Sequence, residues 1–375
     1  MNFTTSKTTI LKHLQTLSKV VPLRSTLPIL SCVYLDSDEN GCLFLKSSDL
    51  EQTVIINTAI KTNESSPIAL PLAKLLEIVS ALSDKEEIVF TAKENEEFEI
   101  SSGVGNYKIA GKNPEEYPET PTTQTQEEIT LLGKDLLDIV NKTTYATSKD
   151  DLKPALSGVY LKFENEVLTA VGTDGHRLVK YTKKITNTKT SGAIVVPVKF
   201  LNIVKNEISN QNNVVFNVGE NHIYTKSNKT TVLSRIIKES FPDFNSVIPK
   251  EIEKTAATIN AQSFINSLKR ILIFSNKTTK QVVVNFNKNE IVLCAEDKET
   301  KSSAKERLKC EYNGEEVESG YNAQYLKEVV QHLGSHEVNI FLSSSLTAAV
   351  LKPNNTTKEE EQDLVALLMP LRTNT

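Results

Sequence analysis

The sequence predicts an α+β protein built from three similar domains in tandem, each with two helices packed on antiparallel sheets. Two observations lead to this fold class: the chain repeats itself at a spacing of domain size, and each repeat alternates between helical and strand periodicity. A length of 375 residues leaves room for two to four domains of ordinary size. The predicted domains span residues 1–122, 128–250 and 254–375.

The internal repeat is clearest in the first two thirds of the chain. Residues 28–35 read PILSCVYL and residues 154–161 read PALSGVYL, so six of eight positions are identical at an offset of 126. Pro71 and Pro197 keep this offset. A fainter third copy begins with the helical pattern QSFINSLKR at 262–270. Because such a unit has the size of a domain and not of a solenoid module, the repeat predicts three domains.

Each repeat contains helical and strand patterns in a fixed order. Ile10, Leu14 and Leu17 follow the spacing of one buried helix face, whereas Leu43 and Leu45 alternate as in a half-buried strand. Polar segments without periodicity, at 115–126 and 249–254, are the predicted linkers. The predicted helices span 7–20, 72–83, 133–143, 198–207, 262–277 and 323–333. The later strands are predicted at 157–163, 167–171, 213–218, 222–226, 281–286, 290–294, 337–342 and 346–351.

The charges are distributed unevenly. The whole chain has 43 Lys and Arg against 47 Asp and Glu, a net charge of −4 that by itself argues weakly against a nucleic-acid partner. The six predicted helices, however, hold twelve Lys and Arg against five Asp and Glu. Solvated lysines on a single helix are commonplace, but here the excess of cations is found in the sum over the six predicted helices. A cationic helical surface would suit sequence-independent contact with phosphates.

Several classes of protein are disfavoured. Cys32, Cys42, Cys294 and Cys310 show neither C-x-x-C spacing nor the pattern of a zinc site, which favours four reduced thiols. No apolar run approaches the length of about 20 residues that a membrane helix needs. The first residues also lack the apolar stretch of a secretory signal. We therefore expect a cytoplasmic protein without a membrane segment.

One short string, TDGHR at 173–177, looks like part of an enzyme site. Asp174 and His176 could serve acid–base chemistry or hold a metal. The chain lacks a second His or carboxylate cluster at ligand spacing, and it lacks a phosphate-binding Gly-rich loop. The equivalent string in the first repeat, SSDLE at 47–51, keeps the Asp and loses the His. We therefore expect the Asp to form a turn, and we expect no catalytic residue, metal or cofactor.

Four strings together resemble a known family. They are RSTLPIL at 24–30, TDGHRL at 173–178, SFPD at 240–243 and LMPLR at 368–372. On these residues the chain is similar, from Met1 to Arg372, to the bacterial DNA polymerase III β subunit, the sliding clamp. The resemblance implies the DNA clamp fold, with one chain as half of a closed ring, and a non-enzymatic processivity factor.

The resemblance also implies partners. A head-to-tail homodimer would encircle double-stranded DNA without sequence specificity. It would bind the replicative DNA polymerase catalytic subunit, the clamp loader and other replication and repair proteins that carry a clamp-binding motif. Packing arithmetic agrees with two copies. Twelve helices spaced about 8–10 Å apart, each about 10 Å thick, close around a hole of roughly 21–28 Å, whereas six leave less than about 10 Å. A duplex needs about 20 Å.

The resemblance assigns residues to three sites. For DNA it favours Arg24, Lys153, Arg177 and Lys199, to which the charge bias of the helices adds Lys12, Lys74, Lys142, Lys205 and Lys269. The expected peptide-binding cleft comprises Leu156, Thr173, Gly175, His176, Arg177, Leu178, Pro242, Val247, Leu346, Ala348, Leu368, Met369, Pro370, Leu371 and Arg372. The expected dimer interface comprises Tyr107, Lys108, Ile109, Ile273, Phe274, Glu296, Asp297 and Glu299.

Some choices stay open at this point. Arg177 has two candidate roles, in DNA contact and in the cleft. Ser246 stands where the family often has a basic residue, and residues 373–375 extend beyond the usual end, so peptide specificity is not defined. The alternatives to a clamp are a DNA-modifying enzyme with a basic groove and a repeat-built scaffold without a DNA role.

Overall fold

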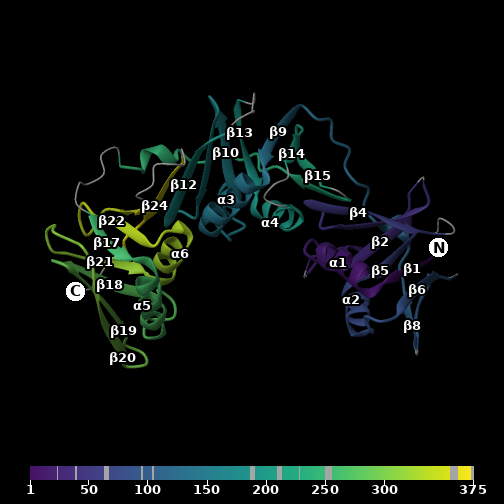
Figure 1. The fold of residues 1–375 in the computed structure, drawn as a ribbon, viewed down its shortest axis with the longest axis horizontal. Coiled ribbons are helices and arrows are strands. Elements are labelled where there is room, and N and C mark those ends of the chain that lie inside the picture. Colours follow the sequence, from purple (N-terminus) through teal and green to yellow (C-terminus); the bar gives the residue numbers. More distant parts are fainter. Residues whose placement is uncertain are drawn as a thin grey trace. The chain divides into compact units, whose positions relative to one another are not determined.

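The structure is a computed structural model. It describes residues 1–22, 24–38, 40–62, 67–93, 96–103, 105–185, 191–208, 213–227, 229–249, 256–354 and 362–372. The described part contains six α-helices, drawn in Figure 1: α1 (Lys7–Ser18), α2 (Leu72–Ala81), α3 (Gly133–Thr143), α4 (Val198–Glu207), α5 (Ala261–Ile273) and α6 (Ala323–Leu333). None of these helices is long and apolar enough to cross a bilayer.

The contacts divide the chain into two compact units. Unit 1 consists of Met1–Lys134 and Lys199–Ile236, and unit 2 consists of Asp135–Val198 and Ile237–Thr375. Each unit contains one sheet of eight strands and one of four. The division into three domains with the boundaries given above stays a prediction, because the strands of the middle third are shared between the two units.

All strand pairs of unit 1 are antiparallel. Its eight-stranded sheet has the order β5 (Ile68–Pro71), β2 (Cys32–Ser37), β3 (Cys42–Ser48), β4 (Gln52–Lys61), β16 (Thr230–Arg235), β15 (His222–Ser227), β14 (Asn213–Val218) and β9 (Glu127–Leu132). Its four-stranded sheet has the order β1 (Asn2–Ser6), β6 (Glu87–Ala92), β7 (Glu97–Ser102) and β8 (Gly105–Ala110).

Unit 2 repeats this plan. Its eight-stranded sheet has the order β13 (Gly192–Pro197), β10 (Gly158–Glu164), β11 (Val167–Thr173), β12 (Arg177–Lys184), β24 (Gln362–Leu368), β23 (Ala349–Pro353), β22 (Glu337–Phe341) and β17 (Ala256–Asn260). Its four-stranded sheet has the order β20 (Ser302–Lys309), β19 (Glu290–Asp297), β18 (Gln281–Asn287) and β21 (Val317–Asn322).

The strand orders reveal two kinds of half-sheet, each present three times. One kind reads β4-β3-β2-β5, β12-β11-β10-β13 and β20-β19-β18-β21. The other kind reads β16-β15-β14-β9, β24-β23-β22-β17 and β8-β7-β6-β1. The two kinds join edge to edge at β4–β16 and at β12–β24. Within the described residues β20 and β8 are edge strands, so two of the three equivalent joints are formed.

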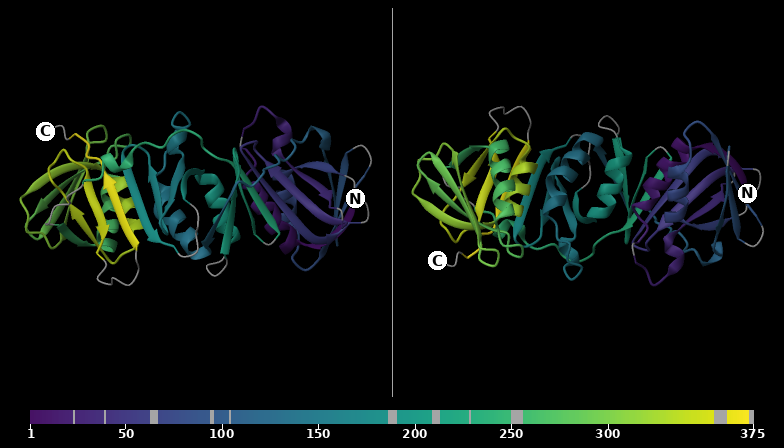
Figure 2. Two further views of the ribbon diagram at one scale, coloured as in Figure 1. Left: turned by 90° about the horizontal axis from the view of Figure 1, so that it is seen from above. Right: turned by 90° about the horizontal axis from the view of Figure 1, so that it is seen from below.

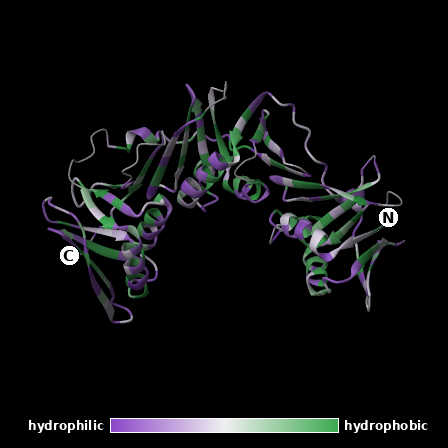
Figure 3. Ribbon diagram, viewed as in Figure 1, coloured by the Kyte–Doolittle hydropathy of each residue, from purple (hydrophilic) through white to green (hydrophobic). Residues whose placement is uncertain are grey.

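The helices lie on the sheets and in pairs. In unit 1, α1 and α2 pack side by side, and in unit 2, α5 and α6 do the same (Figure 2). Ile10, Leu14 and Leu17 of α1 are buried, as their spacing predicts, and the Ser6 side chain caps the helix by accepting a hydrogen bond from Thr9 N. Figure 3 shows the resulting apolar stripes along helices and the alternation along strands.

The predicted helices agree with the observed ones to within a few residues, whereas many of the observed strands were not predicted. Helix α5 ends at Ile273 and not at 277, because Phe274 leaves the helical conformation. The strand predicted at 346–351 begins only at Ala349. Strand β20 was not predicted, since the sequence SSAKERLK has no clear apolar alternation; it pairs with β19 through its backbone, and its Glu306 binds Arg270 of α5. The sequence patterns also gave no range for the first strand of each third, β1, β9 and β17, or for the strands β4, β5, β12, β13, β16, β21 and β24. The predicted linker at 249–254 lies almost wholly outside the described residues.

Candidate functional site

The TDGHR string forms a tight turn between β11 and β12. Asp174 Oδ1 accepts hydrogen bonds from the backbone N–H groups of His176 (2.9 Å) and Arg177 (3.0 Å). Thr173 Oγ1 donates to Arg177 O at 2.7 Å and accepts from Gly175 N at 3.1 Å. Gly175 has φ +88°, a left-handed conformation that glycine adopts without steric cost. The carboxylate of Asp174 therefore has a structural task.

The same turn occurs between β3 and β4. Asp49 Oδ1 accepts from the backbone N–H groups of Glu51 (3.1 Å) and Gln52 (2.6 Å), and Leu50 N donates to Ser48 Oγ at 3.2 Å. In the third repeat Asp297 Oδ1 accepts from Glu299 N at 3.1 Å. The prediction that the Asp recurs as a turn former is confirmed by these bonds. An acid–base reading of the string receives no support from them.

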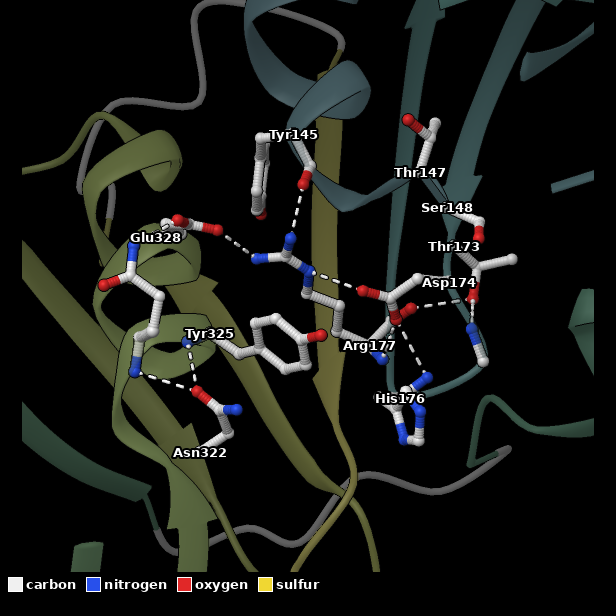
Figure 4. A network of polar contacts seen from close by, with 12 residues as sticks. Tyr145, Thr147, Ser148, Thr173, Asp174, His176, Arg177, Asn322, Tyr325 and Glu328 are labelled. Atoms are coloured by element: carbon white, nitrogen blue, oxygen red, sulfur yellow. Dashed lines mark hydrogen bonds and ion pairs between the residues drawn. The ribbon is translucent and has the colours of Figure 1, made fainter. Parts of the chain in front are cut away.

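Arg177 lies at the centre of a polar network within unit 2 (Figure 4). Its Nε donates to Asp174 Oδ2 at 3.1 Å, and its Nη1 donates to Glu328 Oε2 of α6 at 2.6 Å. Its Nη2 donates to Tyr145 O, and the guanidinium carbon lies 4.2 Å from the centre of the Tyr325 ring. The Arg177 side chain is only 7% exposed. The structure therefore places Arg177 behind the turn and not at a rim or in solvent.

Burial and charge shift two titratable groups of this network. Burial of Glu328 opposes its ionisation, but hydrogen bonds from Arg177 and Gln324 and the Arg177 charge outweigh it and lower the pKa of Glu328. Burial raises the pKa of Tyr145, although the positive charge of Arg177 opposes that shift. Glu328 is thus held as a carboxylate facing the guanidinium.

The turn also holds the C-terminal segment. Strand β24 pairs with β12, so that Arg177 lies opposite Leu368. Beyond the strand, Met369 N donates to His176 O at 2.9 Å, and Leu371 N donates to Gly320 O at 2.8 Å. Backbone hydrogen bonds therefore attach the segment 368–371 to unit 2 on both sides.

An apolar cluster joins strands β11, β12, β23 and β24 to the segment 241–248. Leu178 packs in a buried group with Phe244 and Leu367, and Tyr160 and Phe241 pack against that group. The other buried members are Val171, Val350 and Val365. Among the expected cleft residues, Leu178, Thr173, Arg177 and Leu368 are buried, Leu156, Ala348, Pro370 and Leu371 are half-buried, and Gly175, His176, Pro242, Val247, Leu346, Met369 and Arg372 are exposed. Residues 373–375 lie outside the described residues.

Three large apolar side chains of this set are exposed. Val247 is 54%, Leu346 is 78% and Met369 is 48% exposed, and Val247 and Met369 each follow directly on segments that supply the cluster. We call the cluster together with Val247, Leu346 and Met369 the apolar surface. Exposed apolar side chains that are close in the chain to a buried apolar cluster form a candidate site for a protein or peptide partner.

The candidate DNA-contact residues fall into two groups. Arg24, Lys12, Lys74, Lys153 and Lys269 are exposed. Lys142 is half-buried, with its Nζ 4.2 Å from the centre of the Tyr181 ring, and Lys205 is half-buried on α4. Lys199 Nζ lies 2.5 Å from Asp49 Oδ2 and 3.1 Å from Val20 O. Within these units, Lys199 and Arg177 thus bind the turns of the protein itself.

The candidate interface residues lie on edge strand β8 in unit 1 and, in unit 2, at the end of α5, on β19 and in the turn that leads to edge strand β20. On β8, Tyr107 is 37% exposed and Lys108 is exposed, but Ile109 is buried in its own unit. The resemblance placed both Tyr107 and Ile109 at the interface, but Ile109 is 2% exposed and packs in the core of unit 1. Ile273 is 76% exposed, and with Leu272, Asp297 and Thr300 it lines a cavity of about 380 Å³. Phe274 is half-buried, Asp297 is buried, and Glu296 and Glu299 are exposed.

Sequence reasoning missed the residues that surround Arg177. Tyr145, Tyr325 and Glu328 come from a 3-10 turn (Thr144–Ala146) and from α6, and no motif includes them. Asp174 lies within the TDGHR string, and the matching Asp49 in the first repeat was the one feature of the sequence that indicated its role in the turn. The partnership of Glu328 with Arg177 spans 151 positions of sequence, so no local pattern could reveal it.

Comparison with known proteins identifies the three repeats. A model of the DNA polymerase III beta subunit N-terminal domain matches residues 1–121, the central-domain model matches residues 130–243, and the C-terminal-domain model matches residues 245–372. Together these models cover nearly the whole chain.

Relatives and solved structures agree over the full length. The beta sliding clamp of Haemophilus influenzae is 26% identical over 374 residues, covering 99% of this chain and 100% of the relative. That of Synechococcus elongatus is 28% identical over 376 residues, covering 96% of each chain. A crystal structure of a sliding clamp (DNA polymerase III subunit beta) from Bartonella birtlesii bound to griselimycin has a TM-score of 0.90 at 26% identity and covers 100% of both chains.

Proposed function

Because the chain belongs to the DNA polymerase III beta subunit family, we propose that its edge strands β8 and β20 close the dimeric ring by which this sliding clamp encircles DNA. As a member of this family the chain is a processivity factor and not an enzyme. It therefore needs a closed ring, a surface that tolerates moving DNA and a surface that holds partners. We propose which residues close the ring, which contact DNA and which bind partners.

Ring closure is supported by the arrangement of the half-sheets. Two of the three equivalent joints, β4–β16 and β12–β24, are antiparallel pairs within one chain. Strands β20 and β8 hold the corresponding positions in the remaining half-sheets. Pairing β20 of one copy with β8 of another would satisfy backbone groups that an edge strand leaves open, and two such contacts close the assembly after two copies. This observation carries the proposal.

The exposed cations would contact the DNA backbone. Lys12, Lys74 and Lys269 lie on helices α1, α2 and α5, and Arg24 and Lys153 lie on loops. Single lysines over a phosphate chain give weak contacts that carry no sequence information, which suits a protein that must slide. We do not assign Lys199 and Arg177 to DNA, because their charges are engaged by Asp49 and by Asp174 and Glu328.

The apolar surface would bind the partner proteins. Its exposed Val247, Leu346 and Met369 offer apolar area to a peptide, while the cluster around Leu178 gives it a rigid base. Met369 is unbranched and adapts to different side chains, which suits a surface shared by a polymerase and other partners. A clamp works where the chromosome lies, so we propose a cytosolic protein at the nucleoid.

The decisive experiment separates topological from ordinary binding. The protein is loaded on nicked circular plasmid, half of the sample is linearised, and retention on DNA is measured by gel filtration in high salt. A ring stays on the circle and slides off the ends of the linear form. Equal loss from both forms would contradict a closed ring and would favour ordinary electrostatic binding.

A further inference from the structure

We infer that Glu328 of helix α6 is a positioning residue for the apolar surface: through Arg177 it fixes the turn at 173–177 and thereby the place of Met369. The inference rests on the proposed function, since the apolar surface is the one proposed to bind partner peptides. Glu328 itself need not touch a peptide. The chain of contacts runs from α6 to the turn, as Figure 4 shows. It continues to the C-terminal segment through the hydrogen bond from Met369 N to His176 O.

The first step is that α6 encloses the guanidinium of Arg177. Glu328 Oε2 accepts from Nη1 at 2.6 Å, and the Tyr325 ring, from the same helix, lies 4.2 Å from the guanidinium carbon. Gln324 donates to the other carboxylate oxygen of Glu328 and so orients it. A side chain held in this way and 7% exposed has little freedom to reach an external ligand.

The second step is that Arg177 orients the carboxylate that shapes the turn. Asp174 Oδ2 accepts from Arg177 Nε, while Oδ1 accepts from the backbone N–H groups of His176 and Arg177. His176 O then accepts from Met369 N at 2.9 Å. A rotation of the Asp174 carboxylate therefore moves the backbone to which Met369 is attached.

The third step is an independent parallel in unit 1. There the equivalent turn carboxylate, Asp49, binds Lys199 of α4 at 2.5 Å. Helix α4 is the second helix of its third of the chain, as α6 is of the last third. In both units a charged side chain from the second helix of the following repeat lies against the turn. This side chain is the cation Lys199 in unit 1 and the anion Glu328, which binds Arg177, in unit 2. The contacts differ, since Lys199 binds the turn carboxylate directly and Glu328 acts on it through Arg177, but both place a charge of the following repeat against the turn.

Removal of Glu328 would disturb the turn specifically. Without its carboxylate, the buried guanidinium keeps only Asp174 as a charged partner among the bonds described, and an incompletely paired buried charge shifts toward water. The movement would draw Asp174 with it. Residues linked in such a network show strong energetic coupling, so peptide affinity should fall although no group that touches the peptide was removed.

The experiment uses the full-length chain with Glu328→Gln, Arg177→Lys, the double variant, and Glu290→Gln as a matched control. Glu290 forms an Arg–Glu pair with Arg307 in the same unit, outside the network. Binding is measured by fluorescence anisotropy with a labelled synthetic peptide carrying the clamp-binding motif of the replicative polymerase catalytic subunit. The second readout is the ¹³C-methyl methionine spectrum, because Met1 and Met369 are the two methionines of the chain.

We expect Glu328→Gln to weaken peptide binding about fivefold or more and to shift the Met369 methyl signal while Met1 stays in place. Arg177→Lys should act similarly, since an ammonium cannot bridge Asp174 and Glu328 in the same way. The double variant should be no weaker than the worse single variant, because both act along one path. Glu290→Gln should change neither readout.

Two results would overturn the inference. One is a Glu328→Gln protein that binds the peptide as tightly as the unchanged chain; the other is weakened binding with an unmoved Met369 signal. If Glu328→Gln does not fold, the Arg177→Lys protein decides by the same two readouts. If the unchanged chain binds no peptide, the proposed partner surface fails, and the Met369 signal still shows whether Glu328 positions the segment.

Discussion

Leu50 and Gly175 hold the same position in two copies of one turn, with φ +76° and +88°. Each follows directly on an Asp whose carboxylate accepts hydrogen bonds from the backbone N–H groups of the second and third residues after that Asp. The left-handed conformation costs an ordinary residue roughly 1–2 kcal/mol and costs glycine little. The first repeat therefore has a strained leucine, Leu50, at the position where the second repeat has Gly175, which adopts this conformation without strain.

Replacing Gly175 by alanine should destabilise unit 2 by about 1 kcal/mol through backbone conformation alone. An added Cβ at Gly175 would meet no atom within 4 Å, so no clash contributes. Gly192→Ala is the matched control, because that site is equally open but lacks a positive φ. Urea unfolding measures both variants, and equal stability of the two would show that the turn relaxes without strain.

Neutralising the exposed helix cations should lower the affinity for DNA and should also make that affinity less dependent on salt concentration. Changing Lys12, Lys74 and Lys269 to Gln leaves three DNA phosphates without their proposed cation, so the slope of log affinity against log salt should fall by about 0.9 for each of these phosphates. Lys288→Gln, an exposed lysine at the β18–β19 hairpin, should leave the slope unchanged. The slopes come from titrations of duplex DNA at several salt concentrations. Unchanged slopes in the triple variant would remove these lysines from the DNA surface.

Placing two carboxylates at the edge of unit 2 should break the dimer. Ile273 is 76% exposed beside the cavity at Asp297, and burying its side chain and that of Phe274 against a second copy would remove apolar area from water. Ile273→Asp with Phe274→Asp should therefore sediment with the mass of one chain. Leu152→Asp, at a leucine elsewhere in unit 2 that is 89% exposed, should keep the dimer mass. A dimer of the double variant would refute the assigned interface.

Removing residues 369–375 should abolish binding of polymerase-derived peptides without affecting dimer mass. The deletion takes away Met369 and the segment that Leu371 attaches to Gly320, but it leaves strand β24 and its pairing with β12. Anisotropy with the labelled peptide and sedimentation give the two readouts. Unchanged peptide affinity would show that the partner surface lies elsewhere.

The ion pair of Glu328 should make unit 2 sensitive to acid. Its pKa is lowered from the ordinary value of 4.5, so the folded state binds this proton less readily than the unfolded state. The resulting stabilisation is present above about pH 4.5 and is lost as the pH falls through the lowered pKa. Arg177, Gln324 and Lys327 are the groups that favour the carboxylate. The difference in unfolding free energy between the unchanged chain and Glu328→Gln should therefore be larger at about pH 6 than at about pH 3.5, and an equal difference at both would exclude this linkage.

The local features of the molecule could be read from the sequence. The spacing of Ile10, Leu14 and Leu17 predicted helix α1, and the recurrence of Asp49 and Asp174 predicted a shared turn, because helix periodicity and side-chain capping depend on residues a few positions apart. The threefold repeat likewise predicted three copies of one α+β plan. Strand β20 escaped notice because a charged edge strand has no apolar alternation.

The tertiary structure alone decided which distant residues meet. It joined β4 to β16 and β12 to β24 while leaving β8 and β20 at edges, and it buried Ile109 in its own unit. In the folded chain the Arg177 side chain is also buried, because Glu328 and Tyr325 pack around its guanidinium. Such partnerships depend on how separate elements pack in three dimensions, and a periodicity of two or of 3.6 residues contains no information about them.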